Sequence, residues 1–102
     1  MPIATVVTGP PGCGKTSYVR RRRRDHDLVF DLDVVAAALN PDWLRHGRRP
    51  DDVASLLLGW RDVLVERVRV HLLDRNVWVI VADVETGKAI AQAVRGRLVR
   101  IR

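Results

Sequence analysis

Positions 9–17 combine glycines and prolines with a lysine and hydroxyl side chains, a composition suited to binding phosphate. The residues are Gly9, Pro10, Pro11, Gly12, Cys13, Gly14, Lys15, Thr16 and Ser17. They match the pattern G-x-x-x-x-G-K-[ST] at every fixed position. Glycines let backbone N–H groups converge on an anion, and a helix that begins here directs its positive end toward the same place. This stretch therefore predicts a loop that binds the phosphates of a nucleotide.

Lys15 is one of only two lysines in a chain that contains sixteen arginines. An ammonium group is a compact charge that can reach the β- and γ-phosphates, whereas the planar guanidinium group of arginine fits poorly inside such a loop. The Thr16 hydroxyl is expected to ligate Mg²⁺. We therefore expect ATP or GTP with Mg²⁺ as ligands, and Lys15 as a catalytic residue. Cys13 stands at a variable position and is expected to fill space.

A second feature is the apolar run at 77–83, which ends in Asp83. Beside a phosphate-binding loop, an aspartate in this place orients Mg²⁺ or its water shell, so Asp83 is expected near Thr16 as a catalytic and metal-binding residue. The alternative is an aspartate that only ends the strand. Glu85 could polarise a water molecule, but Val84 separates it from Asp83, whereas motor-type ATPases place the two acids side by side.

Two more aspartates, Asp31 and Asp33, lie at the end of the apolar segment 27–33. In a parallel sheet, ligands bind beyond the carboxyl ends of the strands, so both acids are expected near the phosphates. Asp33 is the preferred candidate for the base that takes the proton of an attacking hydroxyl. It could also be the N-cap of a helix expected at 34–40, and one residue could do both.

The elements that must position these residues alternate between strand and helix patterns. Strands are expected at 3–8, 27–33, 77–83 and 97–101, and helices at 14–24, 34–40, 51–76 and 86–95. Strands that alternate with helices indicate an α/β domain with a parallel sheet covered on both faces. We therefore expect one nucleotide-binding domain over residues 1–102.

The longest periodic segment, 51–76, should bury one apolar face. The residues of that face are Val53, Leu56, Leu57, Trp60, Val63, Leu64, Val68 and Leu72. Trp60 and Trp78 are expected in the core. Trp43 could stack on a base or hold its own loop against the domain.

Composition limits the classes of protein that need consideration. The chain has 102 residues, 47% of them hydrophobic, a formal net charge of +6 and a single cysteine, which excludes an internal disulfide. No apolar run approaches the roughly 18 residues that cross a membrane. The N-terminus lacks the pattern of a signal peptide, so we expect a cytoplasmic protein without a membrane partner. The three histidines lack the spacing of metal ligands.

Five consecutive arginines, Arg20–Arg24, end the first expected helix. They could form a solvated helix end, which the helix dipole favours, or they could contact the phosphate backbone of a nucleic acid. No aromatic residue other than Tyr18 lies nearby, so the segment does not indicate stacking on bases.

The loop with Lys15 and Thr16, the aspartates after the second strand and the run that ends in Asp83 together resemble the P-loop kinases. The similarity is to polynucleotide 5′-kinases, small-molecule kinases and the small P-loop proteins called AAA-domain proteins, which are often encoded by phages. It implies the three-layer P-loop NTPase fold, with about four parallel strands in the order 2-3-1-4. It also implies that Asp33 activates the acceptor hydroxyl.

The sequence departs from this family at two points. An arginine that usually follows the activating aspartate is missing, and Arg45, Arg48 or Arg49 in the next loop is expected to hold the acceptor or a nucleic acid instead. These kinases also continue beyond the fourth strand with a helical lid that supplies arginines, whereas the sequence ends at Arg102. An arginine from an oligomer or a partner chain could complete the site.

Three functions stay open from the sequence. The first is a phosphotransferase that acts on a nucleotide, a polynucleotide end or a small hydroxyl compound. The second is an ATPase or nucleotide-binding module of a nucleic-acid-processing assembly. The third is a scaffold that binds a nucleotide without catalysis.

Overall fold

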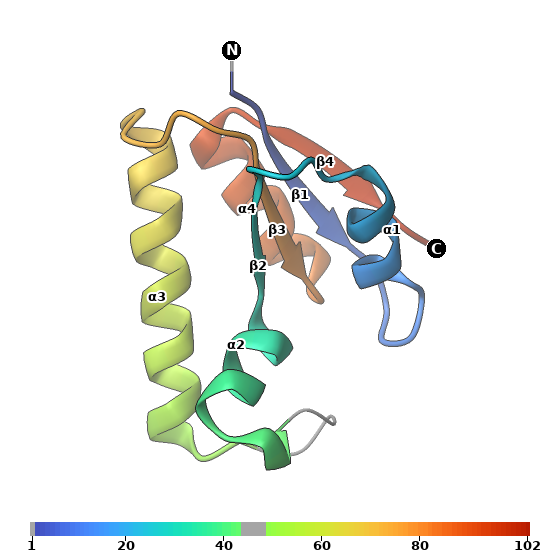
Figure 1. The fold of residues 1–102 in the computed structure, drawn as a ribbon, viewed down its shortest axis with the longest axis vertical. Helices are drawn as coiled ribbons and strands as arrows, with labels where there is room; N and C mark the ends of the chain where they lie inside the picture. Colours follow the sequence, from blue (N-terminus) through green and yellow to red (C-terminus); the bar gives the residue numbers. More distant parts are fainter. Residues whose placement is uncertain (1, 44–48) are drawn as a thin grey trace.

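Strands and helices alternate along the chain in the computed structural model, which describes residues 2–43 and 49–102. The elements are β1 (Ala4–Thr8), α1 (Lys15–Arg22), β2 (Leu28–Asp31), α2 (Leu32–Leu39), the 3-10 turn η1 (Pro41–Trp43), α3 (Asp51–Arg69), β3 (Val77–Val81), α4 (Val84–Val94) and β4 (Arg97–Arg100). The predicted α/β class is confirmed (Figure 1).

All neighbouring strands are parallel, and their order across the sheet is β2-β3-β1-β4. This confirms the expected small parallel sheet and its strand order. Thr8 at the end of β1 pairs with Val81 at the end of β3, and Asp31 at the end of β2 pairs with Ile80. The segments that follow these three strands therefore leave the sheet at one edge, the lower edge in Figure 1.

The central strands β1 and β3 are buried on both faces of the sheet. Successive side chains of a strand point to opposite sides. Val6 and Val79 belong to a cluster that packs against α3 and α4, whereas Val7 and Ile80 contact Val19 of α1 on the other side. Burial on both sides explains why these strands read as continuous apolar runs in the sequence.

The apolar face expected for α3 is only partly correct. Leu57 is fully buried, and Leu64, Val65 and Val68 pack against the core. The exposed members of the expected face are Leu56, Trp60, Val63 and Leu72, with exposed fractions between 42% and 65%. The placement of Trp60 in the core was therefore wrong, because α3 packs mainly on α4 and α2 and buries a narrower stripe than the sequence pattern suggests. None of the helices in the described ranges is long and apolar enough to cross a membrane.

Several element boundaries differ from those expected. The second strand ends at Asp31 rather than at position 33, because the Asp31 side chain caps α2. Helix α3 ends at Arg69 rather than at position 76. There His71 adopts a left-handed backbone and the Leu72 N–H donates to the Arg67 carbonyl, which closes the helix.

Helix α4 approaches β1 closely at Gly87, which is buried. A Cβ atom at this position would lie 2.2 Å from the Thr8 Cγ2 atom, well inside van der Waals contact. The other helical glycine, Gly59 in α3, is exposed, and among the described residues nothing lies within 4 Å of a Cβ added there. The two glycines share a secondary structure but differ in the space around them.

We expect Gly87→Ala to destabilise the protein by about 1–3 kcal/mol, because α4 must move away from β1 to admit a methyl group. Gly59→Ala is the matched control. It should stabilise the protein by about 0.5–1 kcal/mol, since alanine restricts the unfolded chain and favours helix. Urea unfolding of both variants measures the difference, and equal effects would contradict the close packing at Gly87.

Candidate functional site

The loop between β1 and α1 adopts a conformation that depends on its glycines. Gly12 and Gly14 have φ angles of +76° and +90°, in the left-handed region that favours glycine. Among the described residues, nothing lies within 4 Å of a Cβ atom added at either position, so the loop borders open space. The Cys13 N–H donates to the Pro10 carbonyl at 3.2 Å and closes a turn in the middle of the loop.

Lys15 is the first residue of α1, and its side chain folds back over the loop. Its Nζ atom donates to the Gly9 carbonyl at 2.6 Å and to the Pro10 carbonyl at 3.0 Å. The first turn of α1 contains no acidic residue and, in the described part of the chain, no side chain caps it. The helix N-terminus and one ammonium group therefore concentrate positive potential at the loop.

Cys13 is half-buried, and its Sγ atom lies close to Gly9, where an added Cβ atom would be only 2.5 Å from it. The sulfur occupies the space that a side chain at position 9 would need. This contact agrees with the expected space-filling role of Cys13.

Thr16 contacts Asp31, an aspartate that the sequence analysis placed second to Asp33. The Thr16 hydroxyl donates to Asp31 Oδ2 at 2.9 Å. The other carboxylate oxygen, Oδ1, accepts the Asp33 N–H at 3.1 Å and so caps α2. Asp31 is only 8% exposed, so it joins the start of α1 to the start of α2 from within the structure.

Asp33 is not the N-cap of α2, so that alternative was wrong. Helix α2 begins at Leu32, two residues earlier than expected, and Asp33 lies in its first turn. The Asp33 Oδ1 atom forms an ion pair with Arg49 Nη2. The sequence analysis expected Asp33 to activate the acceptor and Arg49 to be one of the arginines that could bind it. The structure places these two residues next to each other.

Arg49 lies immediately before α3, and its side chain is only 18% exposed. Its Nε atom is buried and has no hydrogen-bond partner within the described residues. The other two candidates for the acceptor-binding arginine, Arg45 and Arg48, lie outside the described residues. Of the three candidates, Arg49 is described by the structure, and it lies beside Asp33.

Asp83 lies at the same edge of the sheet, two residues beyond Val81, but its contacts are with its own helix. Its Oδ2 atom accepts the Thr86 N–H at 3.0 Å and the Thr86 hydroxyl at 2.6 Å, which caps α4. These hydrogen bonds, with that from the hydroxyl the larger cause, lower the pKa of Asp83 from its ordinary value. The hydroxyl of Thr16 contacts Asp31 instead.

The arginine run Arg20–Arg24 lies at the far end of α1 from the phosphate loop. All five side chains are exposed, and the Arg22 guanidinium lies over the Tyr18 ring at 3.7 Å from its centre. Since α1 starts at the loop and runs away from it, this segment does not border the loop. Within residues 2–43 and 49–102, no group of three or more His, Cys, Asp or Glu side chains could hold a metal ion by itself.

The part that the sequence analysis missed is the partnership of Thr16 with Asp31. The sequence contained a signal for this contact, because an aspartate between an apolar strand and a helix is a typical helix N-cap. A residue that ends β2 and caps α2 lies at the carboxyl edge of the sheet, where β1 also ends and the glycine loop begins.

Comparisons with known proteins give no family for this chain. No protein-family model matches the sequence, and no curated protein matches it significantly.

Removal of the Thr86 hydroxyl should raise the pKa of Asp83. In Thr86→Ala, the carboxylate loses its shortest hydrogen bond and its pKa should return toward the ordinary 3.8, whereas Thr86→Ser should keep the lowered value. A titration of the Asp83 carboxyl carbon by NMR measures this.

The pH dependence of the free energy of unfolding should follow the pKa of Asp83. Because the folded-state pKa is depressed, the stabilisation is complete above the unfolded-state value and is lost as the pH falls through the folded-state value. As the pH falls below about 4, the free energy of unfolding should therefore decrease less for Thr86→Ala than for the wild type. An Asp83 pKa that is the same in both variants would show that the hydroxyl does not control it.

Proposed function

We propose that this chain is a P-loop NTPase that binds a magnesium nucleoside triphosphate, and that it transfers the terminal phosphoryl group to a hydroxyl acceptor. The observation that carries the proposal is the form of the loop at 9–14. Two left-handed glycines border open space, the N-terminus of α1 has no side-chain cap in the described chain, and Lys15 lies over the loop. Such a loop is built to surround phosphate oxygens.

The residues around Thr16 suit a magnesium ion. Mg²⁺ prefers oxygen ligands, usually one or two protein oxygens together with phosphates and water. The Thr16 hydroxyl and the Asp31 carboxylate supply such oxygens 2.9 Å apart, and Asp83 leaves the sheet at the same edge. When bound, the ion would neutralise charge on the phosphates. The protein would hold it through Thr16, directly or through water on the two aspartates.

Asp33 and Arg49 would form the acceptor side of the reaction. The Asp33 carboxylate is 44% exposed, so a hydroxyl group can reach it. It takes the hydroxyl proton as the acceptor oxygen bonds to the terminal phosphorus, and the bond to the nucleoside diphosphate breaks. The partly buried Arg49 side chain lies beside this carboxylate and would hold an anionic group of the acceptor. The resemblance to P-loop kinases supports the same roles.

A specific observation also favours the second function, a nucleotide-binding or ATPase module that works on nucleic acid. Arg20–Arg24, at the end of α1, and Arg75, Arg95 and Arg97, next to the starts of strands, lie toward the edge of the sheet opposite the glycine loop. Such a protein would bind nucleic acid at one edge and nucleotide at the other, without transferring phosphate between them.

The two lysines of the chain provide a matched test of nucleotide binding. Lys15→Ala should weaken binding of Mg-ATP or Mg-GTP about 100-fold, equivalent to roughly 3 kcal/mol, because a charged donor to the phosphates is lost. Lys88→Ala removes the same charge from an exposed position in α4 and should leave affinity unchanged. Isothermal titration calorimetry measures both. A wild type that binds neither nucleotide, or two variants of equal affinity, would refute the proposal.

The aspartate assignment can be tested by phosphoryl transfer. Asp33→Asn should bind nucleotide normally but transfer phosphate about 10²–10⁴-fold more slowly, since the base is lost. Arg49→Gln should mainly raise the KM for the acceptor. Transfer from labelled ATP to nucleosides, 5′-hydroxyl oligonucleotides and small alcohols would be measured. Unchanged transfer by Asp33→Asn contradicts its role as base. ATP hydrolysis that nucleic acid stimulates, without any transfer, favours the ATPase module.

A further inference from the structure

The formal charge of the molecule is concentrated at the edge of the sheet where the strands begin, the upper edge in Figure 1. We call this region the strand-start surface. Its cationic members are Arg20, Arg21, Arg22, Arg23, Arg24, Arg67, Arg69, Arg75, Arg95 and Arg97, and its acidic members are Asp25, Asp27, Glu66 and Asp74. Ten arginines and four acids give a net charge of +6, which equals that of the whole chain. The other described residues include six cationic and eight acidic side chains, so they add nothing to this excess of positive charge.

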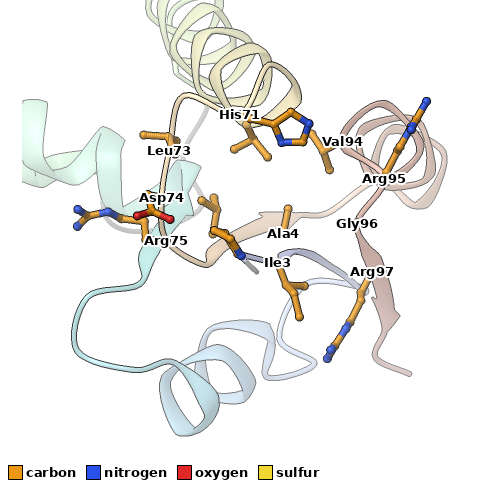
Figure 2. A pocket seen from close by; sticks show the side chains of 13 residues that line it. Ile3, Ala4, His71, Leu73, Asp74, Arg75, Val94, Arg95, Gly96 and Arg97 are labelled. Carbon is orange, nitrogen blue, oxygen red and sulfur yellow. The ribbon is translucent and has the colours of Figure 1, made fainter.

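A pocket of about 720 Å³ lies within this surface, between the ends of α3 and α4 and the start of β1. Its apolar lining includes Ala4, Leu73 and Val94, its basic residues are His71, Arg75, Arg95 and Arg97, and Asp74 adds a carboxylate. In Figure 2, Arg75 lies on one side of the pocket and Arg95 and Arg97 on the other, with His71 between them. A second hollow of about 540 Å³ shares Asp74 and Arg75 with this pocket and adds Arg24, Asp25 and Asp27. The surface is therefore continuous, and this part of it carries carboxylates as well as arginines.

Two residues of the pocket hold an unfavourable backbone conformation. His71 and Arg95 have φ angles of 60° and 53°, and they are the only non-glycine residues with positive φ in the described chain. Each follows a helix whose end is closed by a pair of backbone hydrogen bonds, at a position that usually holds glycine. Glycine would cost less, yet both positions carry a basic residue at the pocket. Strain of this kind is characteristic of functional sites.

Few of these guanidinium groups are neutralised. Within the described residues, Arg69 is the only arginine of the strand-start surface that forms an ion pair with a carboxylate, that of Glu66. Arg22 lies over the Tyr18 ring. A planar guanidinium presents paired N–H donors that match two oxygens of one phosphate group. A surface with several unpaired arginines is therefore suited to a partner with repeated phosphates.

We propose that the strand-start surface binds the phosphate backbone of a nucleic acid, at a site separate from the phosphate loop. The arginines come from several segments and spread over one end of the molecule, which fits an extended chain of phosphates better than a single small anion. No Phe, Tyr or Trp lines either hollow in the described residues, so recognition rests on charge rather than on stacking of bases. Binding should therefore be independent of sequence and strongly salt-dependent.

Fluorescence anisotropy with a labelled duplex of about 20 base pairs, at about 50 to 200 mM salt, tests the proposal. Arg24→Gln combined with Arg75→Gln should weaken binding about tenfold or more and reduce the slope of log K against log salt by about two contacts. The control, Arg100→Gln combined with Arg102→Gln, removes the same charge at the other end of β4 and should bind DNA like the wild type. The Arg24→Gln/Arg75→Gln variant should still bind Mg-ATP, so a failure here is distinguishable from a failure of the nucleotide proposal.

Arg95→Gly separates the binding role from a structural role. Glycine relieves the left-handed backbone, so the melting temperature should rise while affinity for DNA falls. Three results would overturn the proposal: no DNA binding by the wild type, an equal loss in both double variants, or binding to vesicles of anionic lipid but not to DNA. A more stable Arg95→Gly protein with undiminished DNA affinity would also contradict it.

Discussion

The burial of β1 is the constraint on which the rest of the structure depends. All five residues of this strand are buried, and it pairs with β3 on one side and with β4 on the other. A strand without a free face or edge cannot slide along its axis without exposing apolar surface. Packing therefore determines where Thr8 lies, and the glycine loop starts from that point. The position of the glycine loop is therefore a consequence of packing in the core.

The two edges of the sheet follow different electrostatic principles. At the edge with the loop, the groups that act are short-range: the N-terminus of α1 and the ammonium group of Lys15. Such groups can hold an anion without an excess of net charge, because they contact it directly. At the other edge the arginines act together and produce a long-range field. The two sites can therefore differ in salt dependence within one small domain.

Asp31 and Asp33 show how a shift in a boundary changes chemical roles. They are two residues apart, and each was a candidate for the same place beside the phosphates. Because β2 ends at Asp31, that side chain is buried and holds both Thr16 and the start of α2. Asp33 lies one step into the helix, where it is more exposed and meets Arg49. One residue therefore holds the structure together, and the other lies where solvent can reach it.

Local patterns in the sequence were sufficient to predict the alternating elements, the parallel sheet and the glycine loop before Lys15. These features depend on interactions between residues close in the chain, such as hydrogen bonds within a turn and the periodic burial of apolar side chains. The strand order came from the resemblance to P-loop kinases and agrees with the structure. The nucleotide itself remains a prediction from the motif.

Only the tertiary structure decided which side chains meet. The contact of Thr16 with Asp31, the ion pair of Arg49 with Asp33 and the exposure of Trp60 depend on strand register and on how helices lie against the sheet. The concentration of arginines at one end of the molecule also depends on the tertiary structure. The composition gives a net charge of +6, but the charge lies at one end because the strands are parallel, which brings the strand starts and the ends of α1, α3 and α4 together at one edge.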